Sequence, residues 1–169
     1  MFNRLLLALA PIWGWHPVET GMNDARWRAV SAETSPVAIS DPQEVDRFVS
    51  TRIRYAEDAV DRWSGPRETL RRGEGDCEDL AILKRAILIA GGVPRDRVLL
   101  ILAYDTIQRR DHAFVLVYAN GWLILNGRGA EPASSLRDYR PMLAMNDRRT
   151  WVFGQIRSEP GARVTIARR

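Results

Sequence analysis

The chain of 169 residues contains one cysteine, Cys77, and two histidines, His16 and His112. A thiol and an imidazole can form a nucleophile–base pair, in which the histidine takes the thiol proton and the thiolate attacks a carbonyl carbon. This chemistry requires the two groups to be close in space but not in sequence. Cys77 is therefore the single candidate for a thiol nucleophile, and the choice of a partner imidazole is almost as narrow.

Cys77 lies at the start of a helix that we expect to be buried. Residues 80–90 are apolar on most faces, and residues 91–94, Gly-Gly-Val-Pro, mark the end of the helix. At a helix start, free backbone N–H groups and the helix dipole favour a thiolate and can donate to a developing oxyanion. Gly75 leaves room for a close backbone approach. The alternative is a small buried hydrophobic residue without a catalytic role.

His112 lies at the start of a predicted strand. Residues 113–118 are rich in Val, Phe and Tyr, Asn120-Gly121 is a hairpin turn signal, and residues 122–125 form the expected return strand. A histidine at the rim of a strand can reach a helix N-terminus across a core. Taken alone, this histidine could be structural. The single thiol at a helix start and this histidine at a strand start together favour a Cys–His pair.

Asn126 follows the return strand and is the candidate for the residue that orients the imidazole. Its amide oxygen can accept a hydrogen bond from an imidazole N–H, as a carboxylate does in a catalytic triad. A two-residue turn would pair Asn126 with Val115, so that Asn126 and His112 point to opposite faces. The triad hypothesis therefore predicts a three-residue turn or a bulge in this hairpin. Otherwise the Asn-Gly pair is only a turn signal.

Acidic residues flank the cysteine on both sides. Asp76, Glu78 and Asp79 suit the N-cap and first turn of a helix, where negative charge complements the dipole. Unpaired carboxylates would also raise the pKa of the thiol. A cation would neutralise the first two, and Ca²⁺ prefers carboxylate and carbonyl oxygens. Arg71 or Arg72 could do the same without a metal.

The elements that position these side chains predict an α+β fold. Asp41 is an expected N-cap, followed by proline at the first helical position and Glu44 at the third, and apolar residues at helical spacing continue this helix to about Glu57. Short apolar runs at residues 98–103 and 151–156 predict further strands. Helices first and an antiparallel sheet after them are typical of α+β domains.

The composition is that of a globular protein, with 46% hydrophobic and 27% charged residues. These values exclude a disordered chain, a collagen-like chain and a multi-span membrane protein. The net charge of +4 comes almost entirely from arginines, which are scattered among acidic residues and form no basic stripe interleaved with aromatic residues. We therefore expect no nucleic-acid partner.

The N-terminal segment carries a short apolar run, residues 5–10, which ends at Pro11. A bilayer-spanning helix needs about 20 apolar residues, so this run does not cross a membrane. It lies at the lower limit for the apolar region of a secretory signal, and Ala8-Leu9-Ala10 has the spacing of a cleavage site but lies inside the run. The sequence therefore leaves two interpretations of this segment open: a secretory signal that directs export, or an apolar arm that packs on the domain.

Together these residues resemble the bacterial transglutaminase-like cysteine peptidases, of which the LapG-type periplasmic adhesin-cleaving proteases are the best known. The most specific part is the run from Gly73 to Ala81, Gly-x-Gly-Asp-Cys-Glu-Asp-Leu-Ala, with the downstream His112-Ala113. Weaker matches, spread over residues 41–153, are Trp63, Pro66, Glu68, Leu70, Lys84, Gly92-Val93-Pro94, Leu125-Asn126, Tyr139-Arg140-Pro141 and Asn146.

The resemblance implies a papain-like, transglutaminase-like core, with the nucleophile at the N-terminus of a central helix packed on an antiparallel sheet. It implies Cys77 as the nucleophile, His112 as base and acid, and Asn126 as the orienting residue. The family carries Asp at that last position, although Cys–His–Asn triads function in papain-like proteases. It also implies calcium held by Asp76 and Glu78, a surface adhesin as substrate and a periplasmic location, with a cytoplasmic location as the alternative.

We therefore expect a cysteine endopeptidase domain at residues 41–157, an N-terminal extension at residues 1–40 and a C-terminal tail at residues 158–169. Trp63 is a further candidate donor to the oxyanion. The chemistry requires no cofactor, and the expected partner is a protein or peptide substrate. Two alternatives stay open: a transglutaminase that passes the same thioester to an amine, and a catalytically silent homologue that binds a protein.

Overall fold

The structure, a computed structural model, describes residue 9, residues 15–20 and residues 24–155. The main sheet contains strands Trp15–Glu19 (β1), Val98–Asp105 (β4), Arg110–Tyr118 (β5), Trp122–Leu125 (β6), Ala130–Pro132 (β7), Tyr139–Met145 (β8) and Thr150–Gln155 (β9). Within the described chain these form one seven-stranded antiparallel sheet in the order β1-β9-β8-β4-β5-β6-β7.

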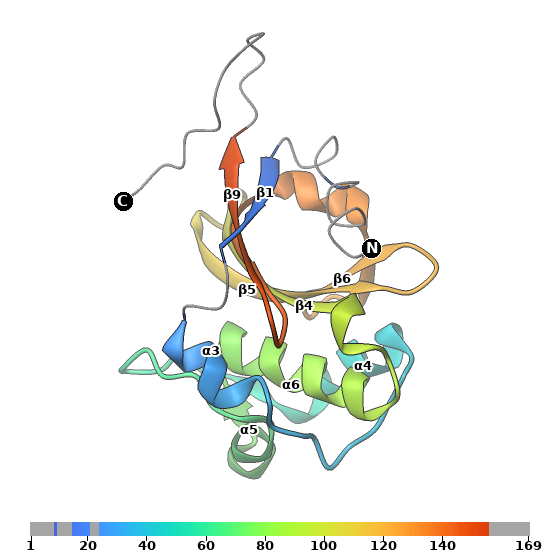
Figure 1. Cartoon of the computed structure of the whole chain (residues 1–169). Coiled ribbons are helices and arrows are strands. Elements are labelled where there is room, and N and C mark those ends of the chain that lie inside the picture. The colour runs from blue at the N-terminus through green and yellow to red at the C-terminus, as the bar shows by residue number, and fades with distance from the viewer. Residues whose placement is uncertain (1–8, 10–14, 21–23, 156–169) are drawn as a thin grey trace, which may run out of the picture.

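The helices gather on one side of this curved sheet (Figure 1). They are Ala25–Val30 (α3), Pro42–Arg52 (α4), Pro66–Arg72 (α5) and Cys77–Ala90 (α6). A short 3-10 segment at Arg95–Arg97 (η1) follows α6, and a second at Ala133–Asp138 (η2) lies on the other side of the sheet (Figure 1). A separate two-stranded parallel sheet joins Arg54–Tyr55 (β2) to Glu74–Gly75 (β3). This mixture of helices and antiparallel sheet confirms the predicted α+β class.

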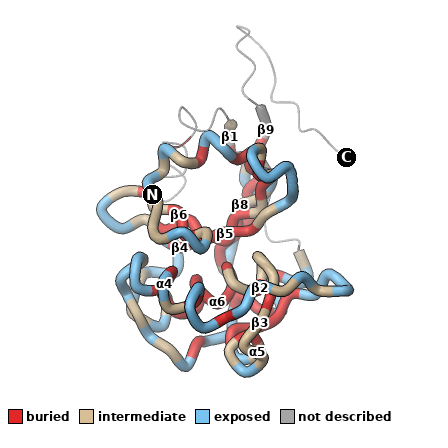
Figure 2. Tube along the Cα trace, turned by 180° about the vertical axis from the view of Figure 1, so that it is seen from behind, coloured by how far each residue is buried: buried red, intermediate tan, exposed pale blue. Residues whose placement is uncertain are grey.

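Helix α6 is central because it packs against β4 and β5 of the sheet and against helices α4 and α5. One face of β5 carries Ala113, Val115 and Val117 into the core cluster shared with α6. The other face carries Phe114 and Leu116 into a second cluster on the opposite side of the sheet. Figure 2 shows the buried residues running through α6 and the sheet. The start of α6 is thereby held firmly against the start of β5.

For helix α4 the predicted N-terminus is correct and the predicted C-terminus is wrong. Asp41 is the N-cap of α4, and its side chain accepts from the backbone N–H of Glu44 at 2.8 Å, as predicted. The helix ends at Arg52 rather than near Glu57, because Ile53 is extended, with φ −111° and ψ 120°, and the next residues pair as β2. The helical spacing of apolar residues continues past this point, which made the sequence misleading.

The segment predicted as an N-terminal extension contributes to the same fold. Strand β1 pairs with β9, and Trp27 of α3 is fully buried in the cluster around α6. The apolar run that bears on export lies outside the described residues except for Leu9, which is buried in the second cluster. The predicted tail at residues 158–169 also lies outside them. Within the described part of the chain, no helix is both long and apolar enough to span a bilayer.

Candidate active site

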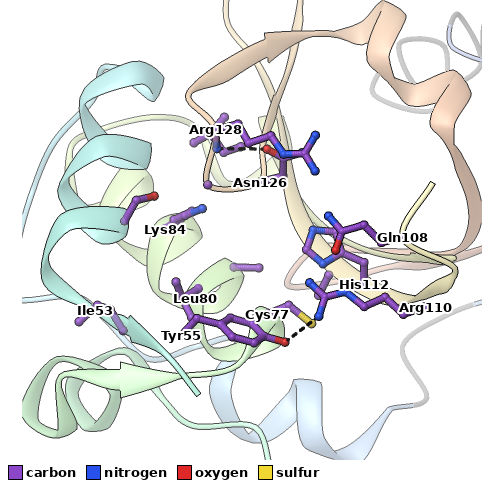
Figure 3. A pocket seen from close by; sticks show the side chains of 15 residues that line it. Ile53, Tyr55, Cys77, Leu80, Lys84, Gln108, Arg110, His112, Asn126 and Arg128 are labelled. Atoms are coloured by element: carbon purple, nitrogen blue, oxygen red, sulfur yellow. Dashed lines mark hydrogen bonds between the residues drawn. The ribbon is translucent and has the colours of Figure 1, made fainter. Parts of the chain in front are cut away.

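The three predicted triad residues line one pocket with a volume of about 250 Å³. Cys77 comes from the first position of α6, His112 from β5, and Asn126 from the position just after β6. In the view of Figure 3 the Cys77 sulfur lies below the His112 ring, and Asn126 lies above it. The topology thus brings together a thiol and an imidazole that are 35 residues apart in sequence.

Cys77 lies where sequence reasoning expected it, at the N-terminus of the central helix. Asp76 is the N-cap and accepts from the backbone N–H of Asp79 at 3.2 Å. The thiol donates a hydrogen bond to Glu78 Oε2 at 2.9 Å. Burial, together with the Glu78 carboxylate, raises the pKa of the Cys77 thiol to about 12, and the backbone N–H of Ala113 acts in the opposite direction. The sulfur is therefore protonated at neutral pH and lies against the first part of β5.

The His112 ring packs against Tyr139, with ring centroids 6.1 Å apart and an interplanar angle of 20°. Its Nδ1 is buried and has no hydrogen-bond partner among the described residues. Burial is the main cause that lowers the pKa of His112 to about 4, and the charge of Arg110 is the second. The imidazole is therefore neutral at pH 7 and able to accept a proton.

The hairpin that carries Asn126 has the geometry that the triad hypothesis required. Tyr118 pairs with Trp122 across a three-residue connection, and Val115 pairs with Leu125. Continuing this register places Asn126 opposite Phe114, on the same face of the sheet as His112. The prediction of a three-residue turn is confirmed.

The hydrogen bonds of Asn126 differ from the prediction. Its Nδ2 donates to the Tyr139 hydroxyl at 2.8 Å, and its Oδ1 accepts from the backbone N–H of Arg128 at 3.3 Å. Among the described residues, no hydrogen bond joins it to His112, so the expected direct contact is not present. The reason is local, because the loop after β6 turns back and supplies its own N–H to the amide oxygen. The side chain instead meets the imidazole through Tyr139, which contacts both.

The acidic residues beside the cysteine divide into two groups. Asp79 is buried, accepts from the Ser64 N–H at 2.6 Å and lies 3.8 Å from Arg72, which also pairs with Asp58 at 3.3 Å. Arg72 thus lies beside Asp79, whereas no ion pair among the described residues joins Arg71 or Arg72 to Asp76 or Glu78, the two acids for which the sequence offered an arginine as the alternative to a metal. Burial raises the pKa of the Asp76 carboxyl to about 7 and also raises the pKa of Asp79.

A metal site is not assembled around these acids. Within the described part of the chain, no three His, Cys, Asp or Glu side chains are grouped so that they could hold a metal ion. Asp76 and Glu78 have the oxygen chemistry that calcium prefers, but among the described residues no third His, Cys, Asp or Glu side chain joins them, so a calcium site here would need carbonyl oxygens or water as further ligands.

Trp63 is not part of the pocket. Its side chain is 6% exposed in the core, meets Trp27 edge to face at 6.4 Å, and lies under the Arg26 guanidinium at 4.4 Å. Its indole N–H has no hydrogen-bond partner among the described residues. The expectation that it donates to an oxyanion is not supported, because the ring packs as a core residue.

Several pocket residues escaped sequence reasoning. Tyr55, Gln108, Arg110 and Arg128 line the pocket together with the predicted triad. Arg110 donates to the Tyr55 hydroxyl at 3.5 Å (Figure 3). Tyr55 reaches this place because β2 pairs with β3 just before the cysteine. Nothing in the local sequence signals such a two-residue parallel pairing.

The sequence and the fold agree with a known family. A sequence profile described as bacterial transglutaminase-like cysteine proteinase BTLCP matches residues 19–152. The chain belongs to this family of cysteine peptidases, and the predicted resemblance and fold are confirmed.

Among solved structures the chain is similar to LapG from Legionella pneumophila, with 29% sequence identity and a TM-score of 0.60 over 65% of this chain and 66% of that chain. The calcium-bound form of that LapG gives 29% identity and a TM-score of 0.61 over 70% of each chain. An EGTA-treated form gives a TM-score of 0.60 at 29% identity, over 65% of this chain and 64% of that one. No curated protein sequence matches significantly.

Proposed function

We propose that this protein is a cysteine endopeptidase that hydrolyses a protein substrate with Cys77 as nucleophile and His112 as general base and acid. The observation that carries the proposal is the shared pocket, in which a thiol at a helix start lies against the strand that bears the histidine. Membership in a family of cysteine peptidases supports the same chemistry.

The proposed reaction proceeds by acyl transfer. His112 takes the Cys77 proton while the sulfur bonds to the carbonyl carbon, and the carbonyl electron pair moves onto oxygen. Backbone N–H groups at the start of α6 stabilise this oxyanion. The C–N bond then breaks, and the imidazolium returns its proton to the leaving amine. Water adds to the thioester with His112 as base, the C–S bond breaks, and the products are a carboxylic acid and the free thiol.

Asn126 is proposed to position the histidine. An amide can fix the ring and tautomer of an imidazole, although it stabilises the imidazolium less than a carboxylate does. Support comes from the hydrogen bond to Tyr139, whose ring packs against His112. In this arrangement Asn126 acts on the imidazole through the tyrosine.

The decisive experiment is a cleavage assay on a mixture of unfolded proteins, read by mass spectrometry of the new termini. We expect wild-type protein to produce new termini and Cys77→Ala to produce none. A primary amine added to the same reaction separates hydrolysis from transglutamination, because the second would give amine adducts at glutamine. A catalytically silent binding protein would show neither cleavage nor amine adducts.

Calcium is a separate part of the proposal. LapG is known in calcium-bound and EGTA-treated forms, and two carboxylates flank the nucleophile here. We propose that Asp76 and Glu78 contribute to a calcium site that stabilises the start of α6. In wild-type protein, CaCl₂ should raise the melting temperature and EGTA should return it to its original value. In Asp76→Asn, CaCl₂ should leave the melting temperature unchanged. An unchanged wild-type melting temperature would remove calcium from the proposal.

A surface adhesin processed in the periplasm is the substrate that the family resemblance favours. The test is incubation of isolated cell-surface proteins with wild-type protein and with Cys77→Ala, followed by identification of fragments specific to the active enzyme. Cleavage of a large surface protein near one terminus would support this substrate. Fragments only from cytoplasmic proteins would contradict it.

A further inference from the structure

A buried ion pair lies at the inner end of the pocket. Lys84 Nζ is 2.7 Å from Asp46 Oδ1, and the two side chains are only 3% and 1% exposed. Lys84 lines the pocket two helical turns after Cys77, on the same face of α6. Asp46 belongs to α4. The pair therefore joins the helix of the nucleophile to a second helix.

Asp46 also holds the loop that follows Asn126. Its Oδ1 accepts from the Gly127 N–H at 3.1 Å, and its Oδ2 accepts from the Gly129 N–H at 2.7 Å. Gln43, one turn earlier on α4, accepts from the Ala130 N–H at 2.9 Å. Both glycines have φ near +98°, a backbone conformation that residues with a side chain rarely adopt. Three successive contacts thus fix the backbone of this loop to α4.

The geometry of Asp46 shows why a charged carboxylate is needed. Both of its oxygens are used, one by Lys84 and Gly127 and the other by Gly129. An amide of the same shape has a single acceptor oxygen, so it would direct its NH₂ group at one of these donors. A buried carboxylate without a cation would be costly, and Lys84 supplies that cation.

We propose that Asp46 and Lys84 are positioning residues for the active site. Asp46 holds the backbone of residues 127–129, and Lys84 pairs with Asp46 and holds its carboxylate in the orientation that the two glycine N–H groups require. Asn126 and the pocket wall that follows it then stay in register with His112. This inference rests on the proposed peptidase function for its catalytic part, whereas the loop anchoring stands on the hydrogen bonds alone.

A neighbouring ion pair provides a matched control. Arg85, the next residue on α6, is 2% exposed and pairs with Asp147, but it does not line the pocket. Its other hydrogen bonds go to the carbonyls of Val98 and Ser31. Loss of Arg85 therefore removes a buried cation from the same helix without touching the loop after Asn126.

The test compares Asp46→Asn, the double variant Asp46→Asn/Lys84→Met, and Arg85→Met, all assayed well below their melting temperatures. Hydrogen exchange of the Gly127 and Gly129 amides measures how firmly the loop backbone is held. The values of kcat and KM for a cleaved peptide measure the activity of the site. We expect both Asp46 variants to lose protection at these amides and to lower kcat by about tenfold or more, since small misplacements of catalytic groups are costly. KM should change much less.

The double variant separates positioning from stability. It removes both buried charges, so its melting temperature should recover relative to Asp46→Asn, while kcat stays low because the loop contacts are still missing. Arg85→Met should lower the melting temperature and leave kcat and both amides unchanged. If the Gly127 and Gly129 amides stay protected from hydrogen exchange in Asp46→Asn, Asp46 does not anchor the loop. If these amides lose protection but kcat stays at the wild-type value, the anchoring does not position the active site. A wild-type protein that cleaves nothing would instead refute the proposed function, with the amide result unaffected.

Discussion

The two sides of the pocket carry opposite charges. On the side of the helix start, Asp76 and Glu78 add to the effect of burial and hold the pKa of the thiol at about 12. On the side of the sheet, burial and the positive charge of Arg110 are the main causes that hold the pKa of His112 at about 4, and Lys84 of α6 and Arg128 act in the same direction. Each side therefore keeps its own group uncharged. The resting site contains a thiol and a neutral imidazole rather than an ion pair, so proton transfer has to accompany attack on the substrate.

Loss of either catalytic group should have the largest effect. Cys77→Ala and His112→Ala each remove one partner of the proton transfer, and kcat/KM should fall by about 10³-fold or more. Peptide cleavage followed by mass spectrometry measures this. The melting temperature of each variant verifies folding, and a folded Cys77→Ala protein with normal turnover would end the peptidase proposal.

Substitution of the orienting residue should have a smaller effect. Asn126→Ala should lower kcat by about tenfold, because the histidine loses its positioning. Asn126→Asp should preserve or raise activity, since a carboxylate also stabilises the imidazolium. Tyr139→Phe keeps the ring against His112 but removes the hydroxyl that Asn126 contacts. If Asn126 acts through Tyr139, this variant lowers kcat too, whereas unchanged kcat would exclude that route.

The acidic side can be tested through the reactivity of the thiol. Glu78→Gln removes a negative charge and a hydrogen-bond acceptor that both raise the pKa of Cys77. The thiol pKa should fall, and because the thiolate is the reactive form, alkylation by iodoacetamide at pH 8 should become faster, by up to about tenfold if the pKa falls by about one. Glu74→Gln is the control, because Glu74 pairs with Arg54 and is not among the main causes of the raised pKa. Equal rates in the two variants would contradict this electrostatic account.

The basic side can be tested through the pH profile. Activity should be lost as the pH falls through about 4, because a protonated His112 cannot accept the thiol proton. Arg110→Gln removes a positive charge, so the pKa of His112 should rise and the acid limb of kcat/KM should move to higher pH by about one unit or less. Arg137→Gln, a change outside the pocket lining, should leave the limb in place. If the acid limb of Arg110→Gln moved to lower pH, it would contradict the account that Arg110 lowers the pKa of His112.

Local patterns in the sequence predicted the main helix and the hairpin well. The apolar run after Cys77 and the residues at its end define α6, and the Asn-Gly signal with its flanking apolar residues defines β5 and β6. The shared pocket followed because the start of α6 lies against the start of β5, although the His112 ring packs with Phe114 and Tyr139 on the other face of the sheet. Helix α6 and the hairpin of β5 and β6 depend on residues that are close to one another in sequence.

Contacts between distant segments were not predictable in this way. The pair of Asp46 with Lys84 joins residues 38 positions apart, and although Lys84 interrupts an apolar run, nothing in the sequence identifies Asp46 as its partner. The partner of Asn126 depends on the rotation of one side chain and on the path of the next few residues. Tyr55 enters the pocket through a two-residue pairing too short to leave a periodic signal. Such features are fixed by tertiary packing.

The small parallel sheet has a consequence for how this protein can vary. Backbone hydrogen bonds from Arg54 N–H to the Gly73 carbonyl and from Ala56 N–H to the Gly75 carbonyl, both 2.9 Å, close the base of the intervening segment. The segment between them contains helix α5 and the buried residues Trp63, Ser64 and Thr69, which hold it against the core, whereas residues 59–62 are exposed. Doubling the length of an exposed loop costs only about 0.6 kcal/mol in closure entropy. Insertions at residues 59–62 can therefore be accepted while the cysteine stays in place.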